Sequence, residues 1–280
     1  MNSLTLNTHA WMEENPMGKL EDIASVIAQG NFEMIALQEI NQSMDAEEVE
    51  DDTFIPASGE TTPVPIKKDN YAWLLVKLLR EKGESYYWSW TATHIGYDEY
   101  DEGIAILMRR PFTSESILVS KSTDYNCHYT RRILKANATF ADRDWTVFSA
   151  HYSWWKDDEG EALFSYEWEK TLPHIERNKG KAILFMGDLN NEANVKAEGY
   201  ELIQQTAPYL KDTFEVADER VGSSTVLSAI DGWENQGGEK RIDYIWSTFD
   251  DEVVEYRVMF DGKNGPIVSD HFGVAVKLKL

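Results

Sequence analysis

Alternating hydrophobic and polar positions predict a strand at the start of the chain. Within residues 2–9, Leu4 and Leu6 share one face, whereas Asn7 and His9 share the other. A strand with apolar residues on one face only has its second face available for polar contacts. The first strand therefore carries candidate functional side chains on the face opposite its leucines.

A helix and a second strand are predicted directly after this strand. Apolar residues recur at helical spacing over 19–29, and Gly30 follows as a stop signal. The apolar run at 34–40 then predicts a strand. A strand, a helix and a strand in this order indicate a start of the βαβ type.

The segment 43–69 has a different composition. It is rich in acidic residues, contains three prolines and has few large apolar residues. These features predict a loop inserted between regular elements, with its charges on a solvated surface.

Strands outnumber helices in the rest of the chain. Periodicity predicts helices over 70–81, 160–178 and 192–205, and it predicts strands over 85–94, 102–109, 115–120, 131–140, 144–151, 183–188, 241–248, 252–260 and 271–280. No linker rich in glycine and serine divides the chain. The pattern favours a single α+β domain over residues 1–280, in which layered sheets are flanked by helices.

Composition limits the classes of partner. Apolar residues make up 42% of the 280 residues, which is enough for a hydrophobic core. The 49 acidic residues exceed the 27 basic residues and give a formal net charge of −22. Such a chain repels polyanions at long range, which disfavours nucleic acids and anionic membranes as partners.

The chain has the features of a cytoplasmic protein. It contains no apolar stretch long enough to span a membrane, and its first residues do not resemble a signal peptide. Its single cysteine, Cys127, cannot form an intramolecular disulfide, which fits a reducing compartment.

Polar residues occur at strand ends or inside strands where a buried carboxylate would need a partner or a metal ion. These residues are Asn7, His9, Glu39, Glu102, His151, Asp188, Asn190, Asp243, Asp270 and His271. Each has an ordinary structural explanation when taken alone. Asp243 is the hardest to explain in this way, because Ile242 and Tyr244 indicate a partly buried strand, where a histidine would be a natural partner.

The order of these residues along the chain is more specific than any one of them. The sequence places Asn7, Gln38-Glu39, His151, the GDLN motif at 187–190, the RIDYI motif at 241–245 and the SDH motif at 269–271 in that order. This series resembles the endonuclease/exonuclease/phosphatase superfamily, which includes DNase I-like nucleases, inositol phosphatases and sphingomyelinases. The resemblance implies a four-layered α/β sandwich with two mainly antiparallel sheets.

The resemblance also implies roles for residues of the predicted metal site. Glu39 would bind Mg²⁺, which prefers carboxylate and water ligands. Asn7 would lie beside it and hold a ligand water or a phosphate oxygen. Asp188 would position or deprotonate the attacking water, and Asn190 would hold phosphate or metal-bound water.

Further residues would act on the phosphate. By the same resemblance, His151 would bind a phosphoryl oxygen, and His271 would stabilise the charge that develops on the phosphate. Asp243 would orient His271. Asp270 could be a second metal ligand.

His9 departs from the pattern of the superfamily, in which many members carry another residue at this position. A neutral imidazole could bind a softer ion such as Mn²⁺. It could equally donate a hydrogen bond to phosphate. The number and identity of the metal ions therefore stay open.

Aromatic residues near the predicted site suggest the substrate. Flat apolar faces bordered by polar groups suit the C–H faces of sugar rings. The aromatic candidates in predicted loops are Trp11, Tyr97, Tyr100, Trp154, Trp155 and Trp233, whereas Trp88 and Trp246 are expected in the core. A phosphorylated sugar is therefore the expected small-molecule substrate.

Several local stretches resemble a bacterial branch of the superfamily, the maltose 6'-phosphate phosphatases. These stretches are LNTHAWMEENP, QEINQ, PVPIKKDNYAWLLVKLL, YDEYDEGIAIL and AIDGWE. The resemblance implies hydrolysis of a cytosolic phosphodisaccharide, with 43–69 and 97–103 forming the sugar pocket. His94, Glu102 and Arg132 are candidate phosphate or sugar contacts, whereas the lysines at 67 and 68 fit a solvated surface.

Two other functions remain as alternatives. One is a metal-dependent nuclease of the same superfamily, which would need a basic groove. The basic pairs at 67–68, 109–110 and 131–132 are the only candidates for such a groove. The other is a non-catalytic, metal-stabilised binding module, which would be expected to lack some of the catalytic residues that this chain retains.

Overall fold

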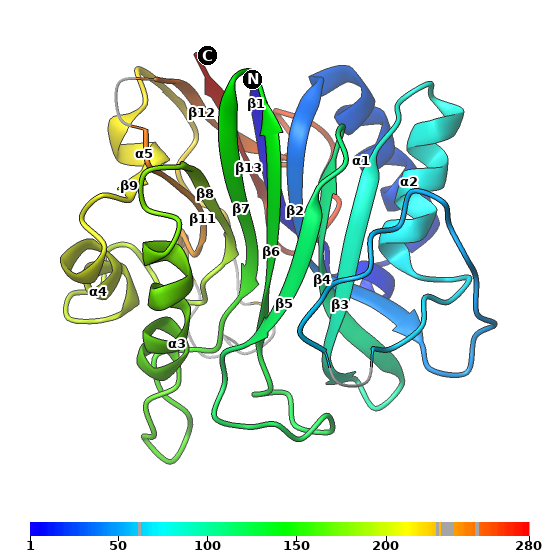
Figure 1. The fold of residues 1–280 in the computed structure, drawn as a ribbon, viewed down its shortest axis with the longest axis horizontal. Coiled ribbons are helices and arrows are strands. Elements are labelled where there is room, and N and C mark those ends of the chain that lie inside the picture. The colour runs from blue at the N-terminus through cyan, green and yellow to red at the C-terminus, as the bar shows by residue number, and fades with distance from the viewer. Residues whose placement is uncertain (61–62, 228–229, 231–237, 250–251, 280) are drawn as a thin grey trace.

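Two β-sheets packed face to face form the centre of the structure, and helices cover both outer faces (Figure 1). The computed structural model describes residues 1–60, 63–227, 230, 238–249 and 252–279, so that Trp233 lies outside the described residues. The layers follow the order helix, sheet, sheet, helix. This arrangement confirms the predicted α+β class and the four-layered α/β sandwich.

The first sheet has seven strands, in the spatial order β10, β12, β13, β1, β2, β4, β3. Their bounds are β1 Asn2–Asn7, β2 Phe32–Ser43, β3 Tyr87–Gly96, β4 Tyr100–Met108, β10 Glu219–Val221, β12 Val253–Met259 and β13 Gly273–Leu278. Helices α1 (Pro16–Gly30) and α2 (Tyr71–Glu81) cover its outer face, and a short 3-10 helix (Ala10–Met12) follows β1. Strands β1 and β2 are parallel and joined through α1, which confirms the predicted βαβ start.

The second sheet has six strands, in the spatial order β5, β6, β7, β8, β11, β9. Their bounds are β5 Thr113–Leu118, β6 Arg132–Phe140, β7 Arg143–His151, β8 Ala182–Asp188, β9 Lys211–Asp212 and β11 Asp243–Ser247. Helices α3 (Phe164–Glu176) and α4 (Gly199–Thr206) cover its outer face, and α5 (Thr213–Val216) is a single turn. The sequence does not predict β9, β10 and α5, because elements of two to four residues are too short to show a period.

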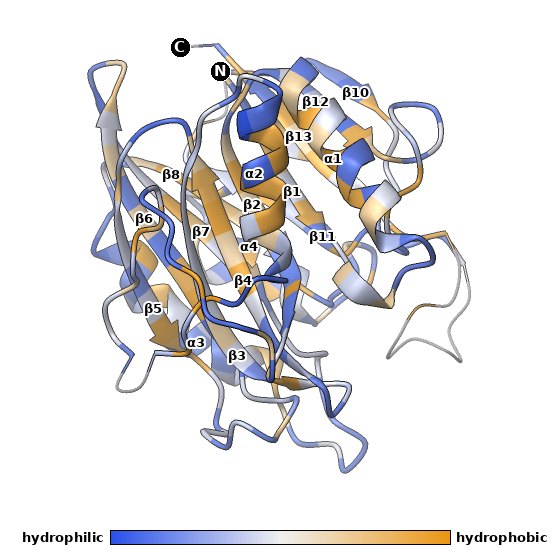
Figure 2. Cartoon of the chain, turned by 90° about the vertical axis from the view of Figure 1, so that its right-hand side faces the viewer, coloured by the Kyte–Doolittle hydropathy of each residue, from blue (hydrophilic) through white to orange (hydrophobic). Residues whose placement is uncertain are grey.

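Hydrophobic alternation along the strands divides the interior into three layers of core. On β2, Ile35 and Leu37 pack against α1 and α2, whereas Met34 and Ala36 pack against the second sheet. Trp88 and Trp246 are buried, as expected from the sequence. Figure 2 shows hydrophobic residues along the central strands, whereas the surface loops are largely hydrophilic. None of the described helices has both the length and the hydrophobicity that a bilayer span requires.

Two pairs of parallel strands determine where polar residues gather. β1 runs parallel to β2 in the first sheet, and β7 runs parallel to β8 in the second. All four carboxyl ends lie at the end of the sandwich opposite the chain termini (Figure 1). Just before these ends, Nε2 of Gln38 donates a hydrogen bond of 3.0 Å to Oγ of Ser149 and so links the two sheets.

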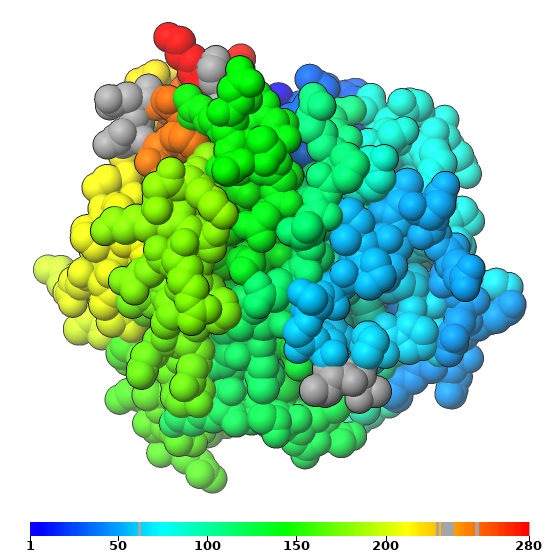
Figure 3. Space-filling view, in the orientation of Figure 1, coloured from blue at the N-terminus to red at the C-terminus, as the bar shows by residue number. Residues whose placement is uncertain are grey.

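Residues 53–58, which we name the edge strap, run along the edge strands of both sheets. The backbone N–H of Ile55 donates to the carbonyl of Trp88 in β3 at 2.7 Å. The backbone N–H of Ser58 donates to the carbonyl of Ser114 in β5 at 3.0 Å. Figure 3 shows the surrounding segment as a light-blue band beside the green strands. The described residues of the predicted loop at 43–69 therefore contain no helix of their own, but they are tied to both sheets.

We expect Gly187→Ala to destabilise the fold strongly. Gly187 has φ of 144°, and an added Cβ would lie 1.9 Å from the carbonyl oxygen of Ala150 on β7. The loss in the free energy of unfolding should exceed about 3 kcal/mol, because backbone of the neighbouring strand must move. Chemical denaturation measures this loss.

Gly83→Ala is the matched control. Gly83 also has positive φ, at 84°, but no atom lies within 4 Å of the added Cβ. Its loss should be about 1 kcal/mol, from backbone strain alone. Equal losses in the two variants would contradict a steric role for Gly187.

Candidate active site

Asp188, at the carboxyl end of β8, lies at the centre of the polar cluster. Its side chain is only 1% exposed. Nδ2 of Asn7 donates to its Oδ2 at 3.1 Å, and the backbone N–H of Asn190 donates to its Oδ1 at 2.9 Å. Nε2 of His151 and Nε2 of His271 each lie 3.7 Å from Oδ2. Residues from both sheets therefore meet at one carboxylate.

Strand register places two of these neighbours. Asp188 pairs with His151 across the parallel strands β8 and β7. It pairs with Asp243 across the antiparallel strands β8 and β11. Because paired residues on adjacent strands project to the same side of a sheet, the three side chains must share one face.

A β-bulge places Glu39 beside this cluster. The register of β2 against β4 shifts between Leu37 and Ile40, and Glu39 has φ of 52°. Nδ2 of Asn7 donates to Oε1 of Glu39 at 2.8 Å. Asn7 therefore bridges the two carboxylates, Glu39 in the first sheet and Asp188 in the second.

Asp243 holds the ring of His271. The sequence predicted a histidine partner for this buried carboxylate, and His271 is that partner. Nδ1 of His271 lies 3.0 and 3.2 Å from the two oxygens of Asp243. Burial opposes a charged imidazole, but the negative charges of Asp243 and Asp188 outweigh it and raise the pKa of His271 well above its usual value. His271 is therefore a cation at neutral pH, with its Nε2 facing Asp188.

Burial and like charge raise the pKa of the acids. Burial is the main cause for Asp188, Asp243 adds to it, and His271 opposes it, so that the pKa of Asp188 rises to about 7. Burial, followed by the negative charge of Asp270, raises the pKa of Glu39. Two buried acids with raised pKa values indicate negative charge that the protein itself does not fully neutralise.

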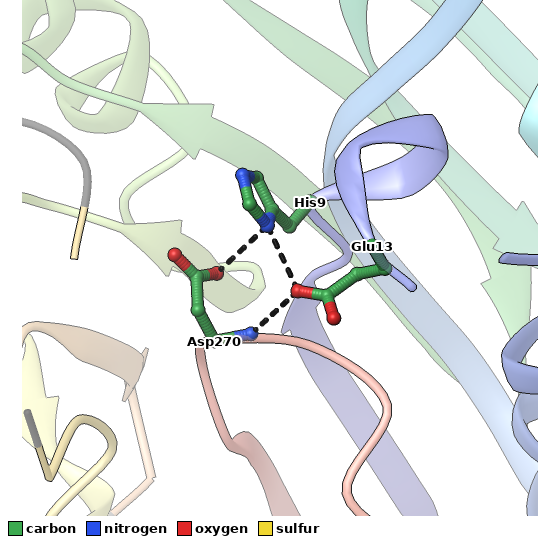
Figure 4. A group of neighbouring side chains, drawn as sticks. All are labelled: His9, Glu13 and Asp270. Atoms are coloured by element: carbon green, nitrogen blue, oxygen red, sulfur yellow. Dashed lines mark hydrogen bonds and ion pairs between the residues drawn. The ribbon is translucent and has the colours of Figure 1, made fainter. Parts of the chain in front are cut away.

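His9 lies between two carboxylates at the edge of this cluster. Nδ1 of His9 lies 2.8 Å from Oε1 of Glu13 and 3.6 Å from Oδ1 of Asp270, and both carboxylates point toward it (Figure 4). The backbone N–H of Asp270 also donates to Glu13, which forms an ion pair with Lys19. Burial opposes a charge on His9, but Glu13, Glu39 and Asp270 raise its pKa to about 9.

The donor groups fit a hard divalent cation. Glu39 and Asp270 offer carboxylate oxygens and repel each other, which a cation would relieve. When bound there, such an ion would neutralise phosphate charge and lower the pKa of a bound water. His9, Glu13 and Asp270 also lie close enough to share an ion, as do Asp188, Asp243 and His271. In the first group, binding through Nδ1 of His9 would require the loss of its proton.

A pocket of about 270 Å³ opens over the cluster. The residues that line it are Glu39, His94, Ile95, Gly96, Tyr97, Glu102, His128, Arg131, His151, Trp154, Asp188, Asn190 and His271. Its floor therefore consists of the residues around Asp188, and its walls come from the β3–β4 turn and from two loops.

Three of the predicted substrate contacts line this pocket. Nε2 of His94 lies 3.4 Å from Oε1 of Glu102, and both side chains are buried. Nε1 of Trp154 is buried without a hydrogen-bond partner. A buried donor of this kind is costly, so Trp154 is suited to donate to a bound ligand.

Three other predicted substrate contacts lie elsewhere. Nη1 of Arg132 donates to Oγ of Ser116 on β5, away from the pocket. Nε1 of Trp11 donates to the carbonyl of Asp69, and its ring packs against the core between the first sheet and helices α1 and α2. Trp155 packs against the core between the second sheet and helices α3 and α4.

Arg131 and His128 also line the pocket, although the sequence carries no signal that singles them out. The pair at 131–132 is a basic candidate in the sequence. Because the start of the strand cannot be located to within one residue, the sequence does not show which of the two arginines faces the site. His128 lies in a loop without periodicity. Tyr97 was noted only as one of several aromatic residues.

The insertion at 43–69 was expected to form part of the pocket wall, and the structure differs from this expectation. Residues 97–103 contribute Tyr97 and Glu102, as expected, but the described residues of 43–69 do not line the pocket. Lys67 and Lys68 form ion pairs with Glu48 and Glu47 instead. The insertion binds the sheet edges because its backbone groups pair there.

Residues 11–271 match the family described as the Endonuclease/Exonuclease/phosphatase family. The chain belongs to this family. The family name covers phosphatases and nucleases, which hydrolyse phosphate esters. Among curated proteins, no match to the chain was found.

Several solved structures share the fold of this chain. A protein of the endonuclease/exonuclease/phosphatase family from Leptotrichia buccalis C-1013-b is 32% identical, with a TM-score of 0.84, and each chain is covered over 100% of its length. A structure described as a mannosyl-6-phosphatase from Bacteroides thetaiotaomicron VPI-5482 is 16% identical, with a TM-score of 0.66 and 100% of both chains covered. TDP2 from Caenorhabditis elegans is 13% identical, with a TM-score of 0.62, over 100% of this chain and 74% of that chain.

We expect the contribution of Asp188 to the stability of the metal-free protein to fall as the pH rises from about 5 to about 8. Because the pKa of Asp188 is raised from 3.8 to about 7, the folded chain holds a proton there that the unfolded chain has lost. The part of the stability that depends on Asp188 therefore decreases with pH across this window. Asp188→Asn lacks this titrating group, so raising the pH should lower the melting temperature of the wild type relative to that of the variant by about 3 °C or more.

Melting temperatures of both proteins in a chelating buffer at the two pH values measure this difference. The Asn variant should resemble the wild type more closely at the lower pH, where Asp188 is protonated. An equal change of melting temperature with pH in the two proteins would show that Asp188 does not carry the buried charge.

Proposed function

We propose that this protein is a divalent-metal-dependent phosphomonoesterase that hydrolyses a phosphorylated sugar. The proposed substrate is maltose 6'-phosphate, which would yield maltose and inorganic phosphate in the cytoplasm. Mg²⁺ is the proposed ion, with Mn²⁺ as a substitute. The proposal goes beyond membership of the family, which includes several kinds of phosphate-ester hydrolase.

The observation that carries the proposal is the pocket over Asp188. Its volume of about 270 Å³ lies near the lower end for ligand sites in proteins, which suits a small molecule. A phosphomonoester presents a terminal phosphate that can reach the floor of such a pocket. A phosphodiester within a polymer would need an open groove that lets the chain pass on both sides.

The walls of the pocket suit a sugar. Tyr97 and Trp154 offer aromatic faces, which pack against the C–H faces of sugar rings. His94 and Glu102 offer polar atoms that can bond hydroxyl groups. An aromatic surface with a few polar groups fits a carbohydrate better than a purely apolar ligand.

The floor supplies the groups for water attack on phosphorus. Asp188, with a pKa of about 7, can accept a proton from the attacking water near neutral pH. The cationic His271 can stabilise charge on the phosphoryl oxygens, and Asp243 holds its ring in place. Asn7 and Asn190 orient the carboxylate of Asp188 from two sides.

A nuclease is disfavoured by the charges around the site. The net charge is −22, and Arg109 is engaged in an ion pair with Glu84. Arg132 bonds to Ser116 and does not line the pocket. These basic residues therefore do not extend Arg131 into a groove that could follow a nucleic acid backbone.

A panel of phosphosugars tests the proposed activity. We expect Mg²⁺-dependent release of inorganic phosphate, with maltose 6'-phosphate as the best substrate among maltose, glucose and mannose 6-phosphates. Asp188→Asn should reduce turnover by about 100-fold or more with the fold retained, because the proton acceptor is lost. Circular dichroism checks the fold.

Plasmid nicking measured in parallel distinguishes the other functions. Nicking without phosphate release from any sugar would favour a nuclease. Metal binding without either activity would favour a non-catalytic module.

Glu39→Gln should raise the metal requirement. Loss of one anionic oxygen ligand weakens binding of a hard cation, so half-maximal activity should need about tenfold more Mg²⁺ or higher. Glu48→Gln is the control, because Glu48 pairs only loosely with Lys67 on the surface. An unchanged Mg²⁺ titration for Glu39→Gln would remove Glu39 from the metal site.

A further inference from the structure

Arg131 is a buried cation beside the cluster at the pocket floor. It is 4% exposed, and it lines the pocket. No carboxylate among the described residues lies within ion-pair distance of it, although its charge acts on the buried Glu167, and its Nε is buried without a hydrogen-bond partner. A buried charge is costly unless a partner contacts it, so a negative group in direct contact is expected to come from a ligand in the pocket.

The position of Arg131 is fixed by the backbone. Oγ of Ser120 accepts a hydrogen bond of 2.8 Å from its backbone N–H, and its carbonyl accepts from the backbone N–H of Val119 at 3.0 Å. Arg131 precedes the first residue of β6, whereas Arg132 is inside the strand. These two hydrogen bonds therefore fix the backbone of Arg131 beside the pocket.

Arg131 determines which ring nitrogen of His151 carries the proton. Its Nη1 lies 3.2 Å from Nδ1 of His151. A guanidinium can only donate hydrogen bonds, so Nδ1 must accept and the proton of the neutral ring must be on Nε2. That Nε2 lies 3.7 Å from Oδ2 of Asp188 and 3.9 Å from Oε1 of Glu39. The N–H of His151 is therefore directed into the acidic cluster.

The charge of Arg131 also acts on the other imidazoles of the pocket. Burial lowers the pKa of His94 to about 3, and Arg131 is the next cause. Burial and Arg131 also lower the pKa of His128. Both rings are neutral at neutral pH, so Arg131 is the permanent positive charge on this wall.

We propose that Arg131 is the anion-binding residue of the pocket and the positioning residue of His151. Its hydrogen bond to Nδ1 keeps His151 as the Nε2–H tautomer, a donor for a phosphoryl oxygen. The remaining guanidinium donors bind the phosphate of a phosphomonoester. The second part rests on the proposed phosphatase function, whereas the tautomer of His151 does not.

Nitrogen-15 spectra of histidine-labelled protein test the positioning role. In the wild type, the ring of His151, assigned by its absence in His151→Gln, should show a protonated Nε2 and an unprotonated Nδ1. In Arg131→Met, this preference should be reduced or reversed. An unchanged tautomer in Arg131→Met would overturn the positioning role.

Calorimetric titration with inorganic phosphate in the presence of Mg²⁺ tests the binding role. Arg131→Met should weaken phosphate binding by about 10- to 100-fold, because a charge-assisted hydrogen bond is lost. Arg132→Met is the matched control and should bind phosphate as the wild type does, since Arg132 bonds to Ser116 outside the pocket. Equal affinities in the two variants would overturn the binding role.

Arg131→Lys is the second variant if the Met variant does not fold. It keeps the charge but loses the forked geometry, so it should keep the His151 tautomer and bind phosphate with intermediate affinity. Wild-type phosphate affinity in this variant, together with wild-type KM for a phosphosugar, would overturn a role for the guanidinium. If phosphosugars are not hydrolysed at all, the proposed function fails while the tautomer measurement still decides the positioning role.

Discussion

The burial of the Asp188 carboxylate is the constraint on which the site depends. A negative charge removed from water at the meeting point of two sheets is unfavourable unless donors surround it. Asn7 and Asn190 supply hydrogen bonds, and His271 supplies a positive charge. These donors do not compensate fully, since the pKa of Asp188 stays raised. The protein thus gives up stability at this point for an acid whose affinity for a proton is matched to neutral pH.

Two histidines with the same distance to Asp188 have opposite charge states. His271 contacts Asp243, and its pKa is raised, whereas His151 contacts Arg131, and burial together with that cation lowers its pKa. The neighbour on Nδ1 determines the state of each ring, because a carboxylate stabilises imidazolium and a guanidinium disfavours it. One side of the carboxylate therefore faces a cation and the other a neutral donor. The electrostatic field at the carboxylate of Asp188 is therefore asymmetric, with positive charge on the side of His271.

The fold and the floor of the site could be predicted from the sequence because both depend on strands. Alternation predicted β1, an apolar run predicted β2, and polar residues at strand ends pointed to Asp188 and His151. The walls could not be predicted in the same way. Whether Arg131 or Arg132 faces the pocket depends on where a strand begins, and a boundary of this kind has no periodic signal. The bulge at Glu39 has the same origin, since a single extra residue leaves the hydrophobic pattern almost unchanged.

The edge strap has a consequence for how the molecule meets other copies of itself. An uncovered outermost strand presents unpaired N–H and C=O groups that can recruit a foreign strand and extend the sheet. At Trp88 in β3 and at Ser114 in β5, these groups are already bonded within the chain. A hydrophilic insertion without regular structure of its own therefore protects both rims at these positions against intermolecular β-pairing. Its acidic residues would further oppose the approach of a second acidic molecule.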